Sequence, residues 1–266
     1  MNISAQVAKS IGRHFVSMSC VQDPPYGAAK ILLFSGFVAD IAGEWFYITA
    51  GHILRDIESA INAGSTFNHW RLGDQTAGNQ SNNIAVPYDF ELKHWCVLED
   101  SSTGLDYAAL HIGGLYRTQL EAGGVVPIAK QAWGDYISKH DYWVLAGIPS
   151  ESISYDDKNN ITAEFVMIPL ISDNPTMSAG QKAVNRFSAR ILEGSDEVVK
   201  DIDGMSGGPI IMLSKASGAW KYSVIGIQSA WCPSTRTIFA CPFSSFAKAL
   251  EPVVLEALSQ CGRQRD

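Results

Sequence analysis

The hydrophobic pattern of this 266-residue chain consists mostly of short apolar runs separated by turn-forming residues. Runs rich in β-branched and aromatic residues, broken by Gly, Pro, Asn and Asp, are typical of the strands of a β-sandwich or β-barrel. The pattern predicts strands at 30–39, 45–50, 94–99, 106–112, 142–148, 161–171, 185–192, 208–213, 220–230 and 236–242. Strands do not alternate with long helices, so a doubly wound α/β fold is disfavoured.

Two segments have the spacing of amphipathic helices. Residues 52–62 place three isoleucines four apart on one face, at Ile53, Ile57 and Ile61. Residues 244–260 follow the same spacing with Phe246, Leu250, Val254 and Leu258. Pro252 lies inside this second segment and is expected to kink or split the helix, because proline has no N–H to donate.

Polar, turn-rich segments predict surface loops at 68–91 and 151–160. Residues 113–140 contain a glycine-bounded connector, which suggests that two β-barrels meet there. The pattern alone leaves two arrangements open for one structural domain: a single sheet system, or two barrels in the halves 1–120 and 121–266.

Bulk composition limits the partners and the compartment. A hydrophobic content of 46% is typical of a globular chain, and a net charge of -7 argues against nucleic-acid or anionic-membrane binding. No run approaches the roughly 18 apolar residues of a membrane span, and the N-terminal sequence lacks the apolar core of a secretory signal. Five cysteines without close paired spacing suggest reduced thiols and a cytoplasmic location: Cys20, Cys96, Cys232, Cys241 and Cys261. One bridge across a hairpin, Cys232–Cys241, is the alternative.

The stretch "DIDGMSGGPII", residues 201–211, surrounds Ser206 with glycines just before an apolar run. Ser206 is either a nucleophile on a tight loop or part of an ordinary glycine-rich turn. A serine hydroxyl attacks only when an imidazole takes its proton, and the imidazole needs a carboxylate that fixes its tautomer. The rest of the chain must therefore supply both groups.

His52 and Asp106 are the candidates for these two roles. His52 lies in "FYITAGHIL", where a strand pattern stops and a helical one begins, and such a corner holds a side chain rigidly. Asp106 immediately precedes an apolar strand in "TGLDYAALHI". Each residue also has a structural interpretation, His52 as a satisfied histidine and Asp106 as a turn residue that bonds its own backbone.

Taken together, "TAGH", "DYAAL" and "GMSGGP" resemble the three signature blocks of the chymotrypsin-like (trypsin-like) serine peptidase family, and they occur in that family's order. A fourth segment, "GIQSAW", resembles the family's substrate-binding strand. The resemblance covers about residues 30 to 245 and implies an all-β fold of two six-stranded antiparallel barrels around a cleft. The Gly-x-Ser-x-Gly elbow of α/β-hydrolases does not fit, because its catalytic residues follow a different order.

The resemblance implies a serine endopeptidase that acts on a protein or peptide substrate without cofactor or metal. Ser206 would be the nucleophile, His52 the general base and Asp106 the residue that orients it. The N–H groups of Gly204 and Ser206 would form the oxyanion hole.

Some positions depart from the family or bear on specificity. Secreted members carry an aspartate immediately before the serine, which pairs with a new N-terminus on activation, whereas this chain has Met205. The loop must then be held by other means, as in bacterial and viral relatives.

Three positions bear on specificity. Lys200 stands at the position that usually lines the base of the primary substrate pocket in this family. It predicts a preference for substrates with an acidic side chain before the cleaved bond, unless Lys200 points to solvent. The substrate-binding strand contributes Ser229 and Trp231, and Trp231, in place of a glycine, predicts a small or partly closed pocket.

Two other functions remain open on the sequence. The chain could be a catalytically silent or partner-activated module that binds a regulatory partner protein, and Met205 and Trp231 favour this alternative. An esterase on the same fold is the other alternative, which no feature of the sequence supports.

Overall fold

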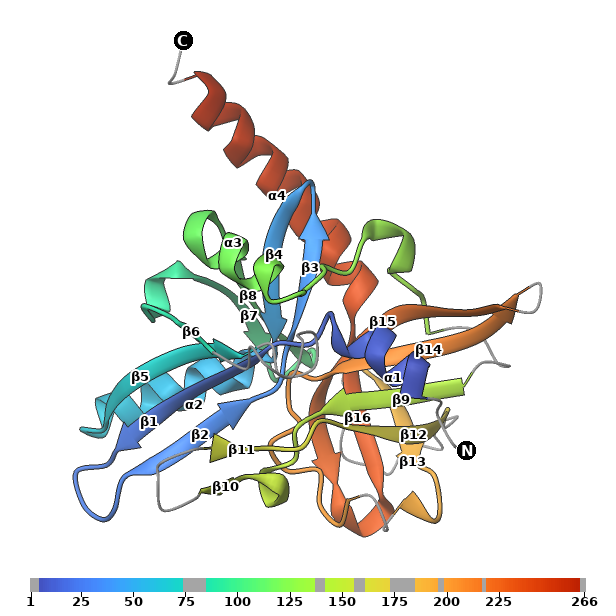
Figure 1. Ribbon diagram of the computed structural model, residues 1–266, viewed down its shortest axis with the longest axis horizontal. Coiled ribbons are helices and arrows are strands. Elements are labelled where there is room, and N and C mark those ends of the chain that lie inside the picture. The colour runs from blue at the N-terminus through green and yellow to red at the C-terminus, as the bar shows by residue number, and fades with distance from the viewer. Residues whose placement is uncertain are drawn as a thin grey trace.

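The computed structural model describes residues 5–73, 85–136, 142–155, 161–172, 185–195, 199–216 and 219–263. Strands are the commonest regular element in this part of the chain (Figure 1). The helices within it are α1 (Ala5–Gly12), α2 (Gly51–Asn62), α3 (Gly114–Ala122) and α4 (Phe243–Arg263). The fold is therefore mostly β, as the hydrophobic pattern predicts.

The N-terminal half contains two four-stranded antiparallel sheets. One has the order β2-β1-β5-β6, formed by Lys30–Phe34, Ser17–Asp23, Thr66–Gly73 and Val86–Pro87. The other has the order β3-β4-β8-β7, formed by Phe37–Ile41, Glu44–Thr49, Leu105–Ile112 and Trp95–Asp100. Apolar side chains of both sheets and of α2 form one buried cluster, which includes Met18, Tyr47, Leu54, Leu72 and Leu110.

The C-terminal half is a closed barrel of six antiparallel strands in the order β12-β13-β16-β15-β14-β9. Its strands are β9 (Tyr142–Gly147), β12 (Val166–Ser172), β13 (Phe187–Ile191), β14 (Pro209–Ala216), β15 (Ala219–Cys232) and β16 (Thr237–Pro242). Closure pairs β9 with β12, so Leu145 lies opposite Ile168. A separate two-stranded antiparallel sheet, β10 (Ser154–Tyr155) with β11 (Ile161–Thr162), lies outside the barrel. The predicted six-stranded barrel is thus confirmed for this half.

The N-terminal half differs from the predicted second barrel. Its sheets are not closed into one ladder within the described residues, and β6 is only two residues long, with Pro87 unable to donate an N–H. The predicted strand 30–39 is divided into β2 and β3 at Ser35 and Gly36. A Cβ on Gly36 would lie 2.5 Å from the Tyr47 ring, so the chain bends where only glycine fits.

The predicted surface loop 68–91 is wrong at its start. Residues 66–73 form β5, whose Trp70 and Leu72 are buried against the other sheet. Strand β1 was also not predicted, because "SMSCVQD" mixes polar and apolar residues. Residues 74–84 and 156–160 of the predicted loops lie outside the described residues.

Both predicted helices are present. Helix α2 buries Ile53, Leu54 and Ile57, while Ile61, predicted on the same face, is exposed. Helix α4 continues through Pro252 as one element, so the predicted split does not occur. Its C-terminal part extends away from the body of the molecule (Figure 1).

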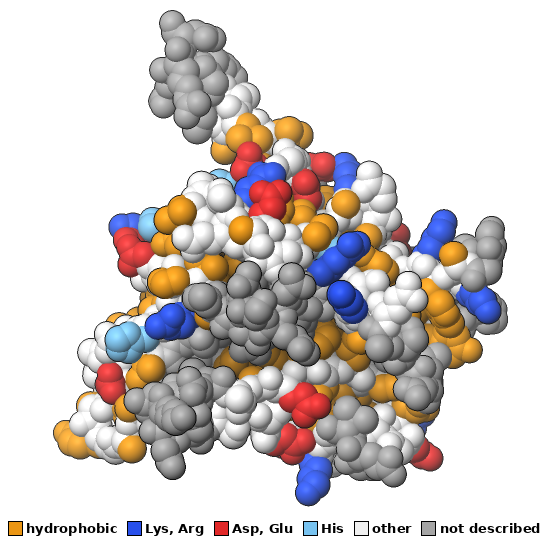
Figure 2. Space-filling view, in the orientation of Figure 1, with side chains coloured by type: hydrophobic (Ala, Val, Ile, Leu, Met, Phe, Trp, Pro, Cys, Tyr) orange, Lys and Arg blue, Asp and Glu red, His pale blue; other side chains and the backbone are white. Residues whose placement is uncertain are grey.

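The two halves pack on each other through a shared apolar cluster. It includes Phe37 and Ile48 from the N-terminal half, Val144 and Ile211 from the barrel, and Phe243 from the start of α4. Figure 2 shows acidic and basic side chains intermixed on the face viewed. Among the described helices, none is long and apolar enough to span a membrane.

The cysteine side chains at positions 20, 96, 232 and 241 are free thiols. The alternative bridge between Cys232 and Cys241 is therefore absent. The β15–β16 register explains this, because it places Thr237 opposite Cys232 and Ile227 opposite Cys241.

His14 makes stability depend on pH. It is 5% exposed, its Nδ1 lies 2.5 Å from the Val126 carbonyl and its Nε2 lies 2.6 Å from the Tyr222 hydroxyl. Burial lowers the pKa of His14 to about 4, outweighing the bond to the Val126 carbonyl that raises it. The pKa of a histidine in an unfolded chain is near 6.5. Between pH 6.5 and 4 the imidazole is therefore protonated in the unfolded state and neutral in the folded state, which favours unfolding.

We therefore expect the free energy of unfolding to fall by about 2–3 kcal/mol from His14 alone as the pH drops from 6.5 to 4. Urea denaturation at several pH values measures this dependence. The His14→Gln variant keeps one donor and one acceptor and does not titrate, so its curve should be flatter by that amount. Equal slopes for wild type and variant would contradict the assignment.

Candidate active site

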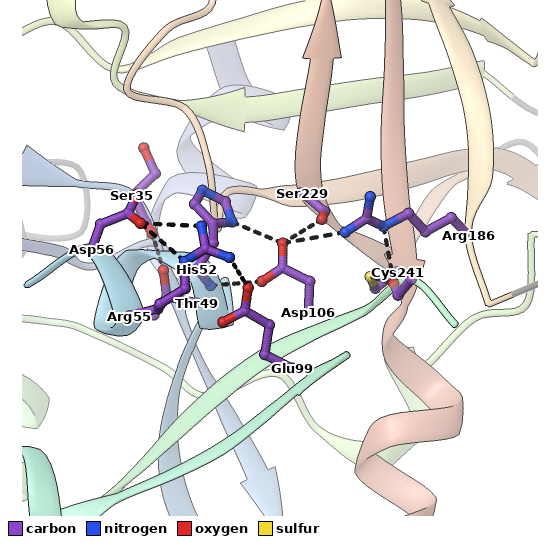
Figure 3. A network of polar contacts seen from close by, with 11 residues as sticks. Ser35, Thr49, His52, Arg55, Asp56, Glu99, Asp106, Arg186, Ser229 and Cys241 are labelled. Atoms are coloured by element: carbon purple, nitrogen blue, oxygen red, sulfur yellow. Dashed lines mark hydrogen bonds and ion pairs between the residues drawn. The ribbon is translucent and has the colours of Figure 1, made fainter. Parts of the chain in front are cut away.

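His52 and Asp106 meet where the two sheets of the N-terminal half face the barrel. His52 is the second residue of α2, which begins two residues after the end of β4, and Asp106 is the second residue of β8. Two hydrogen bonds join them: the backbone N–H of His52 donates to Asp106 Oδ1 at 2.8 Å, and His52 Nδ1 lies 2.8 Å from Asp106 Oδ2 (Figure 3). The carboxylate therefore fixes both the start of the helix and the imidazole ring.

This pair sets the tautomer of His52. A carboxylate only accepts hydrogen bonds, so Nδ1 carries the proton and Nε2 keeps its lone pair. Burial alone would raise the pKa of Asp106, but the hydrogen bonds from His52 and Ser229 outweigh burial and lower its pKa below its usual value. Asp106 thus stays ionised although its side chain is only 2% exposed, whereas that of His52 is 21% exposed.

Ser229 also contacts Asp106. Its hydroxyl donates to Asp106 Oδ2, the same oxygen that accepts from His52. The β15–β16 register shifts between Gln228 and Ala230, which marks a bulge at Ser229. A bulge redirects a side chain and leaves the backbone outside the ladder. The predicted substrate contact of Ser229 would therefore come from its backbone, because its side chain is turned to Asp106.

Arg186 lies on the other side of Asp106, and nothing in its local sequence predicts this. Its guanidinium Nη2 is 3.8 Å from Asp106 Oδ2, and its Nε donates to the Gly104 carbonyl at 2.9 Å (Figure 3). The Cys241 thiol donates to the same carbonyl at 3.3 Å. A cation this close to the carboxylate favours its ionised form.

An ion pair on the helix surface attaches α2 to β7. Arg55, three residues after His52, pairs with Glu99, which lies opposite Asp106 in the β7–β8 ladder. Arg55 also bonds Asp56 at 3.1 Å. The helix that carries His52 is thus linked to the sheet that carries Asp106 at two points.

The Ser206 loop, residues 201–208, leads into β14 and lies against the start of α2. A Cβ on Gly207 would be 2.0 Å from Thr49 Oγ1 and 3.0 Å from the Ala50 nitrogen, at the residues just before the helix. The Gly207 N–H donates to the Gln228 carbonyl at 2.9 Å, next to Ser229. These contacts bring the loop beside the elements that hold His52 and Asp106.

The N–H groups of Gly204 and Ser206 have no acceptor among the described residues. The neighbouring N–H groups of the loop are all bonded: Asp203 to Asp201 Oδ1, Met205 to the Ile202 carbonyl, Gly207 to the Gln228 carbonyl and Gly208 to the Met205 carbonyl. Among residues 203–208, the two unbonded donors are therefore the ones at the positions predicted for an oxyanion hole.

The carbonyl oxygen before each free N–H is anchored. The Asp203 carbonyl accepts from the Ser150 N–H at 2.7 Å, and the Met205 carbonyl accepts from the Gly208 N–H at 2.9 Å. The C=O and N–H of a trans peptide point in opposite directions. Both free N–H groups are thus turned away from these protein partners.

The Ser206 hydroxyl makes no hydrogen bond within the described part of the chain, and neither does His52 Nε2. Ser206 itself is half-buried. Catalytic hydrogen bonds are often long in an unliganded site and shorten when substrate binds. The structure thus brings the two residues into neighbouring elements without a direct bond between them.

The remaining predicted residues lie on the barrel. Lys200 is exposed, and its backbone N–H donates to Glu151 Oε1 at 2.7 Å, so its role in specificity stays a prediction. Trp231 is half-buried and packs against the apolar cluster of the barrel, and its indole N–H has no acceptor among the described residues.

No protein-family model and no curated protein matches the chain. Three solved structures of proteases are similar to it. A thermostable serine protease AL20 from an extremophilic microorganism is 15% identical, with 88% of this chain and 93% of that chain covered and a TM-score of 0.45. Protease Anisep from Arthrobacter nicotinovorans is 11% identical, with 87% and 90% covered and a TM-score of 0.48. Catalytically active tobacco etch virus protease complexed with product is 10% identical, with 91% and 78% covered and a TM-score of 0.44.

Proposed function

We propose that this protein is a serine endopeptidase with Ser206 as nucleophile, His52 as general base and Asp106 as the residue that orients the base. One observation carries the proposal. The free N–H groups of Gly204 and Ser206 lie in a loop packed against the start of the helix that carries the His52–Asp106 pair. A base with a fixed tautomer and paired anion donors are the parts that acyl transfer requires.

The reaction follows from these roles. Ser206 Oγ attacks the scissile carbonyl while its proton passes to His52 Nε2, and the oxyanion receives hydrogen bonds from the Gly204 and Ser206 N–H groups. The imidazolium is stabilised by ionised Asp106 and then protonates the leaving amine, which leaves an acyl-enzyme. Water attacks the ester with His52 again as base, and the acid product departs.

A partner-activated module remains the second candidate function, favoured by the missing hydrogen bond between Ser206 and His52. In that form the loop would approach the base only after a regulatory protein has bound. The two functions differ in the reactivity of the isolated protein.

A fluorophosphonate probe separates them. We expect the purified protein to be labelled on Ser206, because phosphonylation needs the same base and the same N–H donors as acylation. His52→Ala should reduce labelling about 10⁴-fold or more, since removal of a triad residue commonly costs this much or more. His111→Ala provides a matched control, because His111 also pairs with a carboxylate, Glu44, away from the site.

Mass spectrometry of the labelled peptide identifies the modified residue. A wild-type protein that is folded but not labelled would contradict the constitutive enzyme and favour the partner-activated module. Labelling at a residue other than Ser206 would contradict both assignments.

A further inference from the structure

We propose that Ser35 is a positioning residue that holds the Ser206 loop in the orientation that presents its two free N–H groups. The inference rests on the proposed function, because it explains how the oxyanion donors are held without an acidic residue at position 205. Ser35 lies outside the three sequence blocks that predict the triad.

The Ser35 hydroxyl both donates and accepts a hydrogen bond. It is 0% exposed, it donates to the Gly204 carbonyl at 3.2 Å, and it accepts from the Ile148 N–H at 3.0 Å. Ser35 lies between β2 and β3 of the N-terminal half, whereas Ile148 follows β9 of the barrel. One hydroxyl therefore joins both halves of the molecule to the loop.

The bonded carbonyl belongs to the peptide group that lies between the two free donors. The N–H of this peptide, from Met205, donates to the Ile202 carbonyl at 3.0 Å, so both of its ends are fixed. Gly204 has a φ of +84°, and glycine enters many other backbone conformations at little cost. Without the Ser35 bond, the backbone dihedral angles around this peptide are less restrained, so the donors on either side of it lose their fixed orientation.

Met205 anchors the same peptide on its other side. Its side chain is 0% exposed and packs in an apolar cluster with Leu145, Ile202 and Ile210. A Cβ on Gly147 would lie 2.9 Å from Met205 Cε, so the methionine occupies the space beside the strand. Position 205 is therefore occupied by a packed apolar side chain, which cannot form an ion pair. The adjacent Gly204 carbonyl is instead fixed by the Ser35 hydroxyl.

The test compares Ser35→Ala with wild type in fluorophosphonate labelling. The variant should lose about tenfold in the maximal labelling rate, a fraction of the 10²–10³ that follows complete loss of an oxyanion donor. The probe concentration at half-maximal rate and the pH dependence of labelling should not change, because the His52–Asp106 pair is intact. Ser244→Ala is the matched control, since it removes another buried hydroxyl, one bonded to Asp135 away from the site.

Hydrogen exchange gives a second measurement that does not need activity. Ser35→Ala should speed exchange of the Ser150 and Met205 amides, which bond loop carbonyls, while Ser244→Ala should not. Ser35→Cys, with a weaker donor of similar shape, should fall between wild type and Ser35→Ala, and it replaces Ser35→Ala if that variant does not fold.

Labelling and exchange equal to wild type in the Ser35 variants would overturn the proposal. A wild type that is not labelled would instead overturn the endopeptidase function. In that case exchange alone decides the role of Ser35: faster exchange of the two amides supports it, and unchanged exchange overturns it.

Discussion

Asp106→Asn should lower turnover of the proposed endopeptidase about 10⁴-fold while the protein stays folded. Both carboxylate oxygens accept hydrogen bonds, Oδ1 from the His52 backbone and Oδ2 from the His52 ring and Ser229. An asparagine keeps one acceptor for the backbone N–H and places an NH₂ group against the ring. His52 Nδ1 must then accept, so the proton moves to Nε2 and the base can no longer take the Ser206 proton.

Cleavage of a fluorescent casein substrate measures this loss, and the fluorophosphonate labelling rate provides a second value. Asp40→Asn is the matched control, because Asp40 also accepts a backbone N–H, from Gly43, in a turn away from the site. The control should retain wild-type activity. An Asp106→Asn variant with activity near that of wild type would show that the carboxylate does not orient the base.

The local sequence was sufficient for the elements that carry His52 and Asp106. Both residues stand at boundaries between a buried strand and another element, and such boundaries are visible in the hydrophobic pattern. Strands of the barrel were predictable for the same reason, since each contains a short apolar run. Closure of that barrel agrees with the resemblance to the peptidase family.

The strands of the first sheet were not predictable in this way. In β5 only Trp70, Leu72 and Gly73 are buried, and most of the other residues are polar, so the segment is similar to a surface loop. Its strand conformation depends on pairing with β1, a partner that is distant in sequence. Tertiary pairing therefore overrides a weak local signal.

The residues that support the site were also not predictable from the sequence. Ser35 contacts the loop across 169 positions of the chain, and Arg186 reaches the Gly104 carbonyl across 82. Neither residue lies in a recognisable motif, and each acts through a backbone carbonyl, which any residue type supplies. Motifs thus identify the groups that react, whereas the fold determines which groups hold them in position.

Gly207 shows how closely the halves meet at the site, and Gly207→Ala should destabilise the protein by roughly 4 kcal/mol or more. Its φ is +85°, a conformation that costs other residues about 1–2 kcal/mol. The added Cβ would also lie 2.0 Å from Thr49 Oγ1 and 2.5 Å from the Ser35 carbonyl oxygen. The second contact involves backbone, so the loop must move away from the connection between β2 and β3 to relieve it.

Urea denaturation of Gly207→Ala and Gly43→Ala separates the two causes of this loss. Gly43 has the same φ of +85°, and a Cβ there would meet nothing within 4 Å, so its substitution carries the conformational cost alone. The difference between the two variants, about 2–3 kcal/mol, then measures the close approach of the Ser206 loop to β4 and α2. Equal destabilisation of the two variants would mean that the Ser206 loop can move to accommodate the added Cβ at little cost. The oxyanion donors would then lack the rigid support that the proposed function requires.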